Sequence, residues 1–247
     1  MVRLQYAVQI ASGLAILHDH VGAVHADLKP TNLVVVTRSS ANSTCTIFED
    51  SPLFDFCEFL NRSVLLNDFD NSEMIRYNAS MSSETDECNF RRPLHEKNYY
   101  VSPEQVLQRP LTHAIDVYSL GGLMYYLLTD GLRPYDNPEE GSLDALQVMK
   151  RIANGRLPIL PTKWRHFLEA TEDFGRAFEW NASAATTVPA IKSEQDVIAI
   201  ITGSLMHAMT ACWSYNPLDR SSARQIAEFL ENVFDHVERS GWLQKRV

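Results

Sequence analysis

The sequence predicts a mainly α-helical fold with short β hairpins. Residues 115–128 are apolar almost all round, which is typical of a buried helix. Apolar residues recur at helical spacing over residues 1–17, which predicts an amphipathic helix. The β-branched run Leu33–Thr37 follows a turn-like loop and indicates a short strand. Helices therefore form most of the expected core.

The other expected elements follow in chain order. A short extended piece and a second strand flank the run just described, and three more helices fill the second half of the chain. Three polar or aperiodic tracts separate these elements, and two of them look like insertions. The expected pieces are an extended segment at 22–25, a strand at 63–67, helices at 143–153, 196–213 and 220–237, a polar tract at 70–97, and insertions at about 38–62 and 163–189.

Composition places the chain among ordinary globular proteins. Its 247 residues are 45% hydrophobic, which is enough to bury one sizeable core, and we treat residues 1–247 as one domain. A net charge of −9 disfavours nucleic acid as the main partner. No apolar run reaches the roughly 18 residues of a membrane span, and the four cysteines show no C-x-x-C spacing. We expect a cytoplasmic protein, or the cytosolic part of a longer membrane protein.

Two polar segments beside the strands carry the strongest chemical signal. Residues 25–32 read His-Ala-Asp-Leu-Lys-Pro-Thr-Asn, and residues 67–70 read Asn-Asp-Phe-Asp. Phosphoryl transfer needs a carboxylate that orients the acceptor hydroxyl, a cation near the moving phosphate and oxygen ligands for Mg²⁺. An isolated H-x-D would indicate a solvated loop, but the eight-residue pattern disfavours that interpretation. The side chains that can supply these groups are Asp27, Lys29, Asn32 and Asp68.

These segments resemble the catalytic loop and the magnesium loop of eukaryotic-type protein kinases. The likeness continues downstream in the same order. Residues 102–104, Ser-Pro-Glu, resemble the segment that closes a kinase activation loop, and residues 116–121 resemble the start of the buried central helix. Residues 212–220 resemble the segment whose arginine pairs with that glutamate. The chain is thus similar to the C-terminal lobe of a kinase catalytic domain.

The resemblance implies roles for ten residues. Catalysis would fall to Asp27 and Lys29, Mg²⁺ to Asn32 and Asp68, and ATP to these two ligands together with Val34. The structural roles are a His25–Phe69 ring stack, a hydrogen-bonded Asp116 beneath the catalytic loop and a buried ion pair between Glu104 and Arg220. Removing one member of a buried pair costs roughly 3 to 5 kcal/mol.

The sequence also departs from the family pattern. Ala26 replaces the arginine that binds an activation-loop phosphate in many kinases, so regulation by that route is not expected. Asp70 replaces a glycine, and Lys97 falls where a threonine usually bonds the catalytic aspartate. No G-x-G-x-x-G, strand lysine or partner-glutamate helix precedes the first helix. We therefore expect that the N-terminal lobe is missing and that the chain is truncated.

Three functions remain in view. The first is a protein kinase that transfers the γ-phosphate of ATP to hydroxyls of a protein substrate. Lys29 and Pro30 after Asp27 favour the serine/threonine class. The second is a pseudokinase, in which the lobe serves as a binding or scaffold module. The third, a small-molecule phosphotransferase, would not need the Ser-Pro-Glu segment or Arg220 and is disfavoured. The oligomeric state stays open.

Overall fold

A computed structural model describes most of the chain. The described residues are 1–37, 62–75, 90, 99–139, 141, 143–165 and 191–241. Most of the two expected insertions therefore lies outside the described residues, as does Lys97. Among the helices that the structure describes, none has the length and apolarity needed to cross a membrane.

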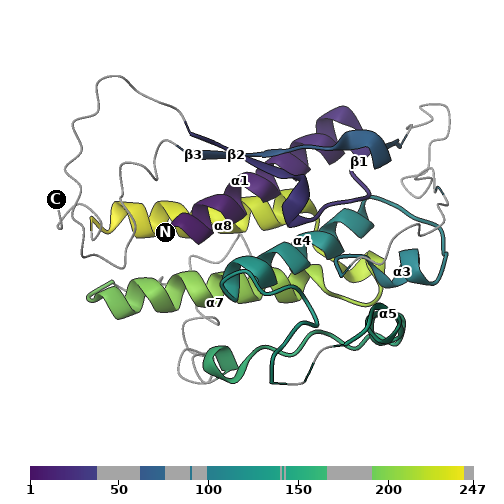
Figure 1. The fold of residues 1–247 in the computed structure, drawn as a ribbon. Helices are drawn as coiled ribbons and strands as arrows, with labels where there is room; N and C mark the ends of the chain where they lie inside the picture. Colours follow the sequence, from purple (N-terminus) through teal and green to yellow (C-terminus); the bar gives the residue numbers. More distant parts are fainter. Residues whose placement is uncertain are drawn as a thin grey trace.

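Four long helices form the body of the molecule. They are α1 (Val2–Ile16), α4 (Ala114–Leu128), α7 (Glu194–Cys212) and α8 (Ala223–Arg239). Figure 1 shows α1 beside α8 and α4 beside α7, and their residues pack accordingly, with α7 also against α8. The mainly helical fold predicted from periodicity is therefore confirmed.

The central helix α4 is buried on nearly every side, as its apolar sequence predicted. Tyr118 and Trp213 are only 4% and 5% exposed, and their ring centroids are 6.3 Å apart. The indole N–H of Trp213 donates to the Tyr118 carbonyl oxygen at 3.2 Å. A Cβ on Gly121 would lie 2.7 Å from the Trp213 indole, so glycine is what lets α7 approach α4 here.

The strands form two small antiparallel pairs within the described part of the chain. β1 (Ala23–Val24) pairs with β4 (Glu73–Met74), and β2 (Leu33–Thr37) pairs with β3 (Arg62–Leu66). The β2–β3 pair lies along α1, where the backbone N–H of Val64 donates to Gln9 Oε1 at 2.8 Å. Since each pair joins a strand next to residues 25–32 with a strand next to residues 67–70, pairing brings the two loops together.

Several helix boundaries differ from the prediction, because side-chain caps decide them. The last helix was expected to begin at Arg220, but α8 begins at Ala223 after the 3₁₀ turn η4 (Pro217–Asp219). Ser222 caps it, and its side chain accepts a hydrogen bond from the Gln225 N–H. Similar boxes at Ser193 and Asp144 start α7 and α5 (Ala145–Ala153). The short α3 (Pro103–Val106) and the π-helical turn η1 (Leu17–Val21) were not predicted.

Candidate active site

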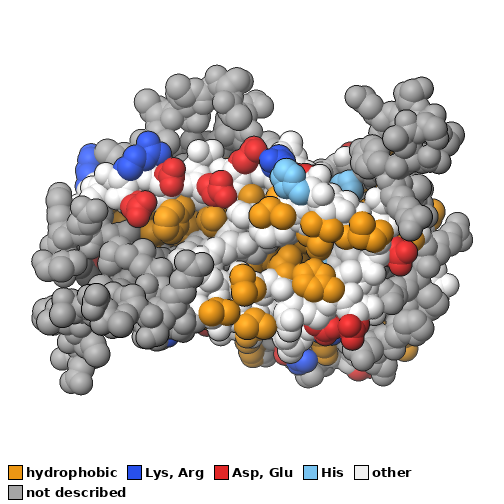
Figure 2. Space-filling model, turned by 90° about the horizontal axis from the view of Figure 1, so that it is seen from above, with side chains coloured by type: hydrophobic (Ala, Val, Ile, Leu, Met, Phe, Trp, Pro, Cys, Tyr) orange, Lys and Arg blue, Asp and Glu red, His pale blue; other side chains and the backbone are white. Residues whose placement is uncertain are grey.

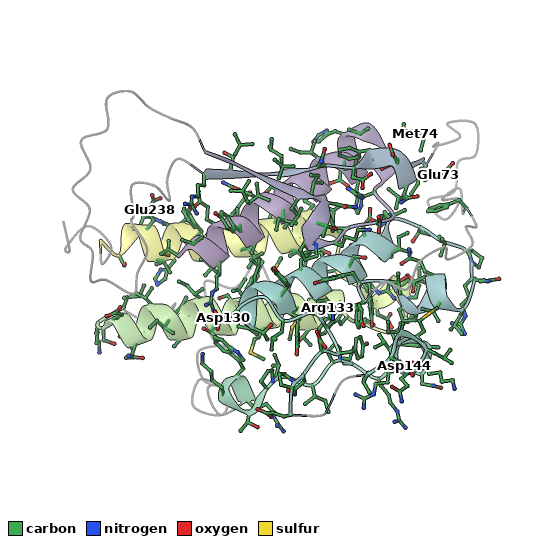
Figure 3. All side chains as sticks on the ribbon, viewed as in Figure 1. Glu73, Met74, Asp130, Arg133, Asp144 and Glu238 are labelled. Atoms are coloured by element: carbon green, nitrogen blue, oxygen red, sulfur yellow. The ribbon has the colours of Figure 1, made fainter. Side chains whose placement is uncertain are left out.

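Residues 25–32 and 67–70 lie side by side in the structure. The first segment connects β1 to β2 and includes the 3₁₀ turn η2 (Pro30–Asn32), and the second follows β3. The backbone N–H of Asn67 donates to the Asn32 carbonyl oxygen at 2.9 Å, which ties the two segments directly. In Figure 3 the labelled Glu73 and Met74 mark β4, where the chain that leaves the second segment pairs with β1.

The carboxylate of Asp27 is the centre of the site. Its Oδ2 atom accepts hydrogen bonds from Lys29 Nζ at 2.8 Å, from Asn32 Nδ2 at 3.2 Å and from Asn71 Nδ2 at 3.4 Å. The side chain is 15% exposed, so it reaches solvent while its direction is fixed from several sides. Such an oriented carboxylate can accept a hydrogen bond from a hydroxyl that approaches from solvent.

Asn32 presents its amide in an orientation that suits a metal ligand. Its Nδ2 atom donates to the Asp27 backbone oxygen at 2.8 Å, so Oδ1 is turned away as an acceptor and receives the Thr31 hydroxyl at 3.3 Å. Asp68 is exposed. The described residues contain no group of three His, Cys, Asp or Glu side chains that could hold a metal. One amide and one carboxylate oxygen nevertheless fit Mg²⁺, which commonly keeps several waters.

Asp116 supports the first segment from below. Its fully buried carboxylate accepts the backbone N–H groups of His25 at 2.7 Å and Ala26 at 2.8 Å. His18 adds a third contact, with Nε2 2.9 Å from Asp116 Oδ2. Ala26 has a φ of +63°, an uncommon conformation for a residue with a side chain. The two backbone N–H groups that donate to Asp116 hold this turn in place.

His25 links the two segments through its ring. Its Nε2 atom lies 3.0 Å from the Asn67 carbonyl oxygen, and its ring centroid lies 5.0 Å from that of Phe69 at an interplanar angle of 42°. The expected contact with Phe69 is therefore present, with tilted rather than parallel rings. His25 is fully buried and is not placed to act on a substrate.

Glu104 and Arg220 form the expected buried ion pair. Arg220 Nη1 and Nη2 donate to the two carboxylate oxygens of Glu104, the second at 2.9 Å. The Arg220 side chain is 0% exposed and the Glu104 side chain is 4% exposed. The guanidinium also donates to three backbone carbonyls and lies over the Tyr118 ring. Gln105 Nε2 reaches the Ala26 carbonyl oxygen at 3.5 Å, so α3 connects this pair to the turn above Asp116.

Val34 lies on the open face of the β2–β3 pair. It is 40% exposed and stands opposite Leu65, which is 53% exposed. Figure 2 views the molecule from this side and shows hydrophobic side chains across the middle of the face. An apolar surface next to the candidate metal ligands can take the flat base of a nucleotide.

Asp70 stands where the family pattern has a glycine, and its effect on the backbone is smaller than expected. Asp70 lies in the 3₁₀ turn η3 (Phe69–Asn71) and is not among the described residues with positive φ. The residue that needs the left-handed conformation is Asp68, with a φ of +63°. Aspartate tolerates this conformation better than most residues do. The backbone of the second segment therefore forms without a glycine.

Sequence reasoning missed two residues that contact this site. Asn71 directly follows residues 67–70, and its position there was the available signal. His18 lies within the turn η1, which was itself not predicted, and nothing in the sequence pattern linked it to Asp116.

Comparisons with known proteins agree with this geometry. The family model described as "Protein kinase domain" matches residues 2–230. Relatives include the serine/threonine-protein kinase/endoribonuclease IRE1b of Arabidopsis thaliana, which is 28% identical over 60% of this chain and 14% of its own length. The sensor for unfolded proteins in the ER ire1 of Schizosaccharomyces pombe is 30% identical over 55% of this chain and 12% of its own.

A third relative aligns over more of the chain. Serine/threonine-protein kinase H1 of Mus musculus is 23% identical over 87% of this chain and 43% of its own length. The chain thus spans less than half the length of each of these relatives. Because the family model covers nearly all of the sequence, and because residues 25–32, residues 67–70 and the Glu104–Arg220 pair adopt one connected site, the chain belongs to the protein kinase family.

Proposed function

We propose that the protein is a serine/threonine kinase that transfers the γ-phosphate of ATP to hydroxyls of a protein substrate. The observation that carries the proposal is the partly exposed Asp27 carboxylate, which Lys29 and Asn32 hold above the buried Asp116. A surface loop that served only for solubility would need no buried carboxylate beneath it.

Each side chain then has a chemical task. Asp27 orients the acceptor hydroxyl and accepts its hydrogen bond. Lys29, with Nζ 2.8 Å from Asp27, is a cation beside the position where charge develops on the transferred group. Asn32 and Asp68 would hold Mg²⁺, which neutralises phosphate charge when it is bound.

The remaining site residues fix position and specificity. Val34 would lie against the base of ATP, and His25, Phe69, Asp116, Glu104 and Arg220 hold the loops. Lys29 at the second position after Asp27 supports the serine/threonine class, and the relatives named above include serine/threonine-protein kinases. Because the reaction consumes ATP, the proposal includes a cytoplasmic location, or the cytosolic part of a longer membrane protein.

The proposal also states which part of a kinase domain this sequence forms. We assign residues 1–247 to the C-terminal lobe, with insertions at about 38–62 and 163–189. Within the 247 residues there is no G-x-G-x-x-G segment to cover the phosphates. Activity is therefore best measured on a form extended upstream in the genome, beside the 247-residue chain.

The experiment measures Mg²⁺-dependent transfer of ³²P from ATP to peptides whose only hydroxyl is serine, threonine or tyrosine. We expect labelling of the serine and threonine peptides by the extended form, and its loss with Asp27→Ala. Asp219→Ala is the matched control, because Asp219 is an exposed aspartate in the turn η4, where it accepts a hydrogen bond from Asn216. Labelling that Asp27→Ala leaves intact would sink the proposal.

The pseudokinase alternative rests on Ala26, on the extra charge of Asp70 beside the metal ligands, on Lys97 and on the N-terminal lobe missing from these 247 residues. A binding module would keep its fold and a protein partner while it transfers no phosphate. Nucleotide binding separates the cases further. If the extended form binds Mg²⁺–ATP but labels no peptide, or binds no nucleotide, the scaffold function replaces the kinase function.

A further inference from the structure

Asn71 reaches the central carboxylate from outside the loop that carries it. Lys29 and Asn32, which also donate to Asp27 Oδ2, are only two and five residues further along the chain. Asn71 is 44 residues away and donates through Nδ2 at 3.4 Å. This contact is therefore a tertiary link between the segment that holds Asp68 and the loop that holds Asp27.

The backbone around Asn71 is fixed on both sides. It ends the 3₁₀ turn η3, in which the Ser72 N–H donates to the Phe69 carbonyl oxygen at 2.9 Å. The Ser72 hydroxyl reaches the His25 carbonyl oxygen at 3.4 Å, and β4 begins at the next residue. Asn71 is partly buried. A side chain on such an anchored turn can position a neighbour rather than merely touch it.

We propose that Asn71 is a positioning residue that holds the Asp27 carboxylate and couples it to the segment carrying Asp68. The role in turnover rests on the proposed kinase function, whereas the coupling itself does not. A neutral amide N–H stabilises and aims the carboxylate without the charge that a second lysine would add. Because only Phe69 and Asp70 separate Asp68 from Asn71, a cation bound at Asp68 would act on the same turn.

The chemical consequence is specific to the transfer step. If Asn71 only aims Asp27, its loss lowers kcat while binding of ATP and peptide stays the same. For Asn71→Ala in the extended form we expect kcat to fall about tenfold, with both KM values changed less than about twofold. Glu73→Gln, two residues further on in exposed β4, is the matched control and should retain the full kcat.

A second measurement needs no enzyme activity. Asn71→Asp places a carboxylate against that of Asp27 and should lower the Tm by about 3 °C, because like charges at this distance repel. In an Asp27→Asn background the same change should cost less than about 1 °C, since the repulsion is gone. This double-mutant cycle measures the interaction between residues 71 and 27 directly, whatever the protein catalyses.

The outcomes separate the two proposals. A kcat loss with steady KM values, together with a cycle that depends on Asp27, supports the role of Asn71. If Asn71→Ala leaves kcat unchanged, or raises KM for ATP alone, the positioning role is wrong. If the wild-type extended form transfers no phosphate, the proposed function fails, and the Tm cycle then decides by itself whether Asn71 holds Asp27.

Discussion

Removal of the Arg220 side chain should be among the most destabilising single changes in this fold. Arg220→Met would lose both bonds to Glu104 and the bonds to the carbonyls of Ala114, Ser214 and Tyr215. Methionine refills part of the volume over Tyr118 but leaves the Glu104 carboxylate, 4% exposed, without its cation. Breaking one partner of a buried pair costs about 4 kcal/mol.

The assays are urea unfolding, which gives the free energy of unfolding, and thermal unfolding, which gives the Tm, both followed by circular dichroism and tryptophan fluorescence. For a domain of this size, about 4 kcal/mol corresponds to a Tm lower by roughly 10 °C. Arg133→Met is the matched control, because Arg133 also bonds a carboxylate, that of Asp136, and covers a ring, that of Tyr99. Its side chain is 51% exposed, so the loss should stay within about 1 kcal/mol.

A double variant sharpens the test. With both charges removed, in Glu104→Met combined with Arg220→Met, no buried charge is left unpaired. The loss of stability should then be smaller than the sum of the two single losses by about 2 kcal/mol or more. The burial reasoning is refuted if Arg220→Met costs no more than Arg133→Met.

Three further predictions concern packing and pH. Gly121→Ala should lower the free energy of unfolding by about 1 to 3 kcal/mol, because the new methyl group meets Trp213 at 2.7 Å; urea unfolding measures it, and an unchanged midpoint contradicts it. Gly13→Ala, whose methyl group would meet its nearest neighbour at 3.6 Å, should raise that free energy by about 0.5 to 1 kcal/mol in the same assay. Burial lowers the pKa of His207 below its usual 6.5. Just below pH 6.5 the unfolded state therefore binds more protons than the folded state, so the free energy of unfolding falls as the pH drops through this range. His207→Gln should weaken this acid dependence between pH 7.5 and 5, whereas equal slopes in both proteins would contradict it.

Local sequence patterns predicted much of the fold. Strand β2 matches the expected Leu33–Thr37, because a β-branched run between polar loops has no competing helical period. The buried α4 was predicted to within one residue at its start, since few soluble helices are apolar all round. Both elements are decided by residues close together in the chain.

Features set by distant contacts were harder to predict. The start of α8 depends on Ser222 and on a turn that contains Pro217, and hydrophobic periodicity predicts neither a cap nor a turn. The contact of Asn71 with Asp27 joins residues 44 positions apart in the chain, next to the pairing of β1 with β4. At position 70 the family pattern predicted a need for glycine, whereas the left-handed residue is Asp68.

The kinase account is tested most directly by the initial rate of phosphoryl transfer from Mg²⁺–ATP in the extended form, with and without the Asp27 carboxylate. We predict that Asp27→Asn lowers the rate by roughly 10²- to 10⁴-fold, because the acceptor hydroxyl loses the group that orients it. Circular dichroism should show an unchanged fold, and Asp219→Asn should keep the wild-type rate. A wild-type rate no higher than that of Asp27→Asn would contradict the account and favour a binding module.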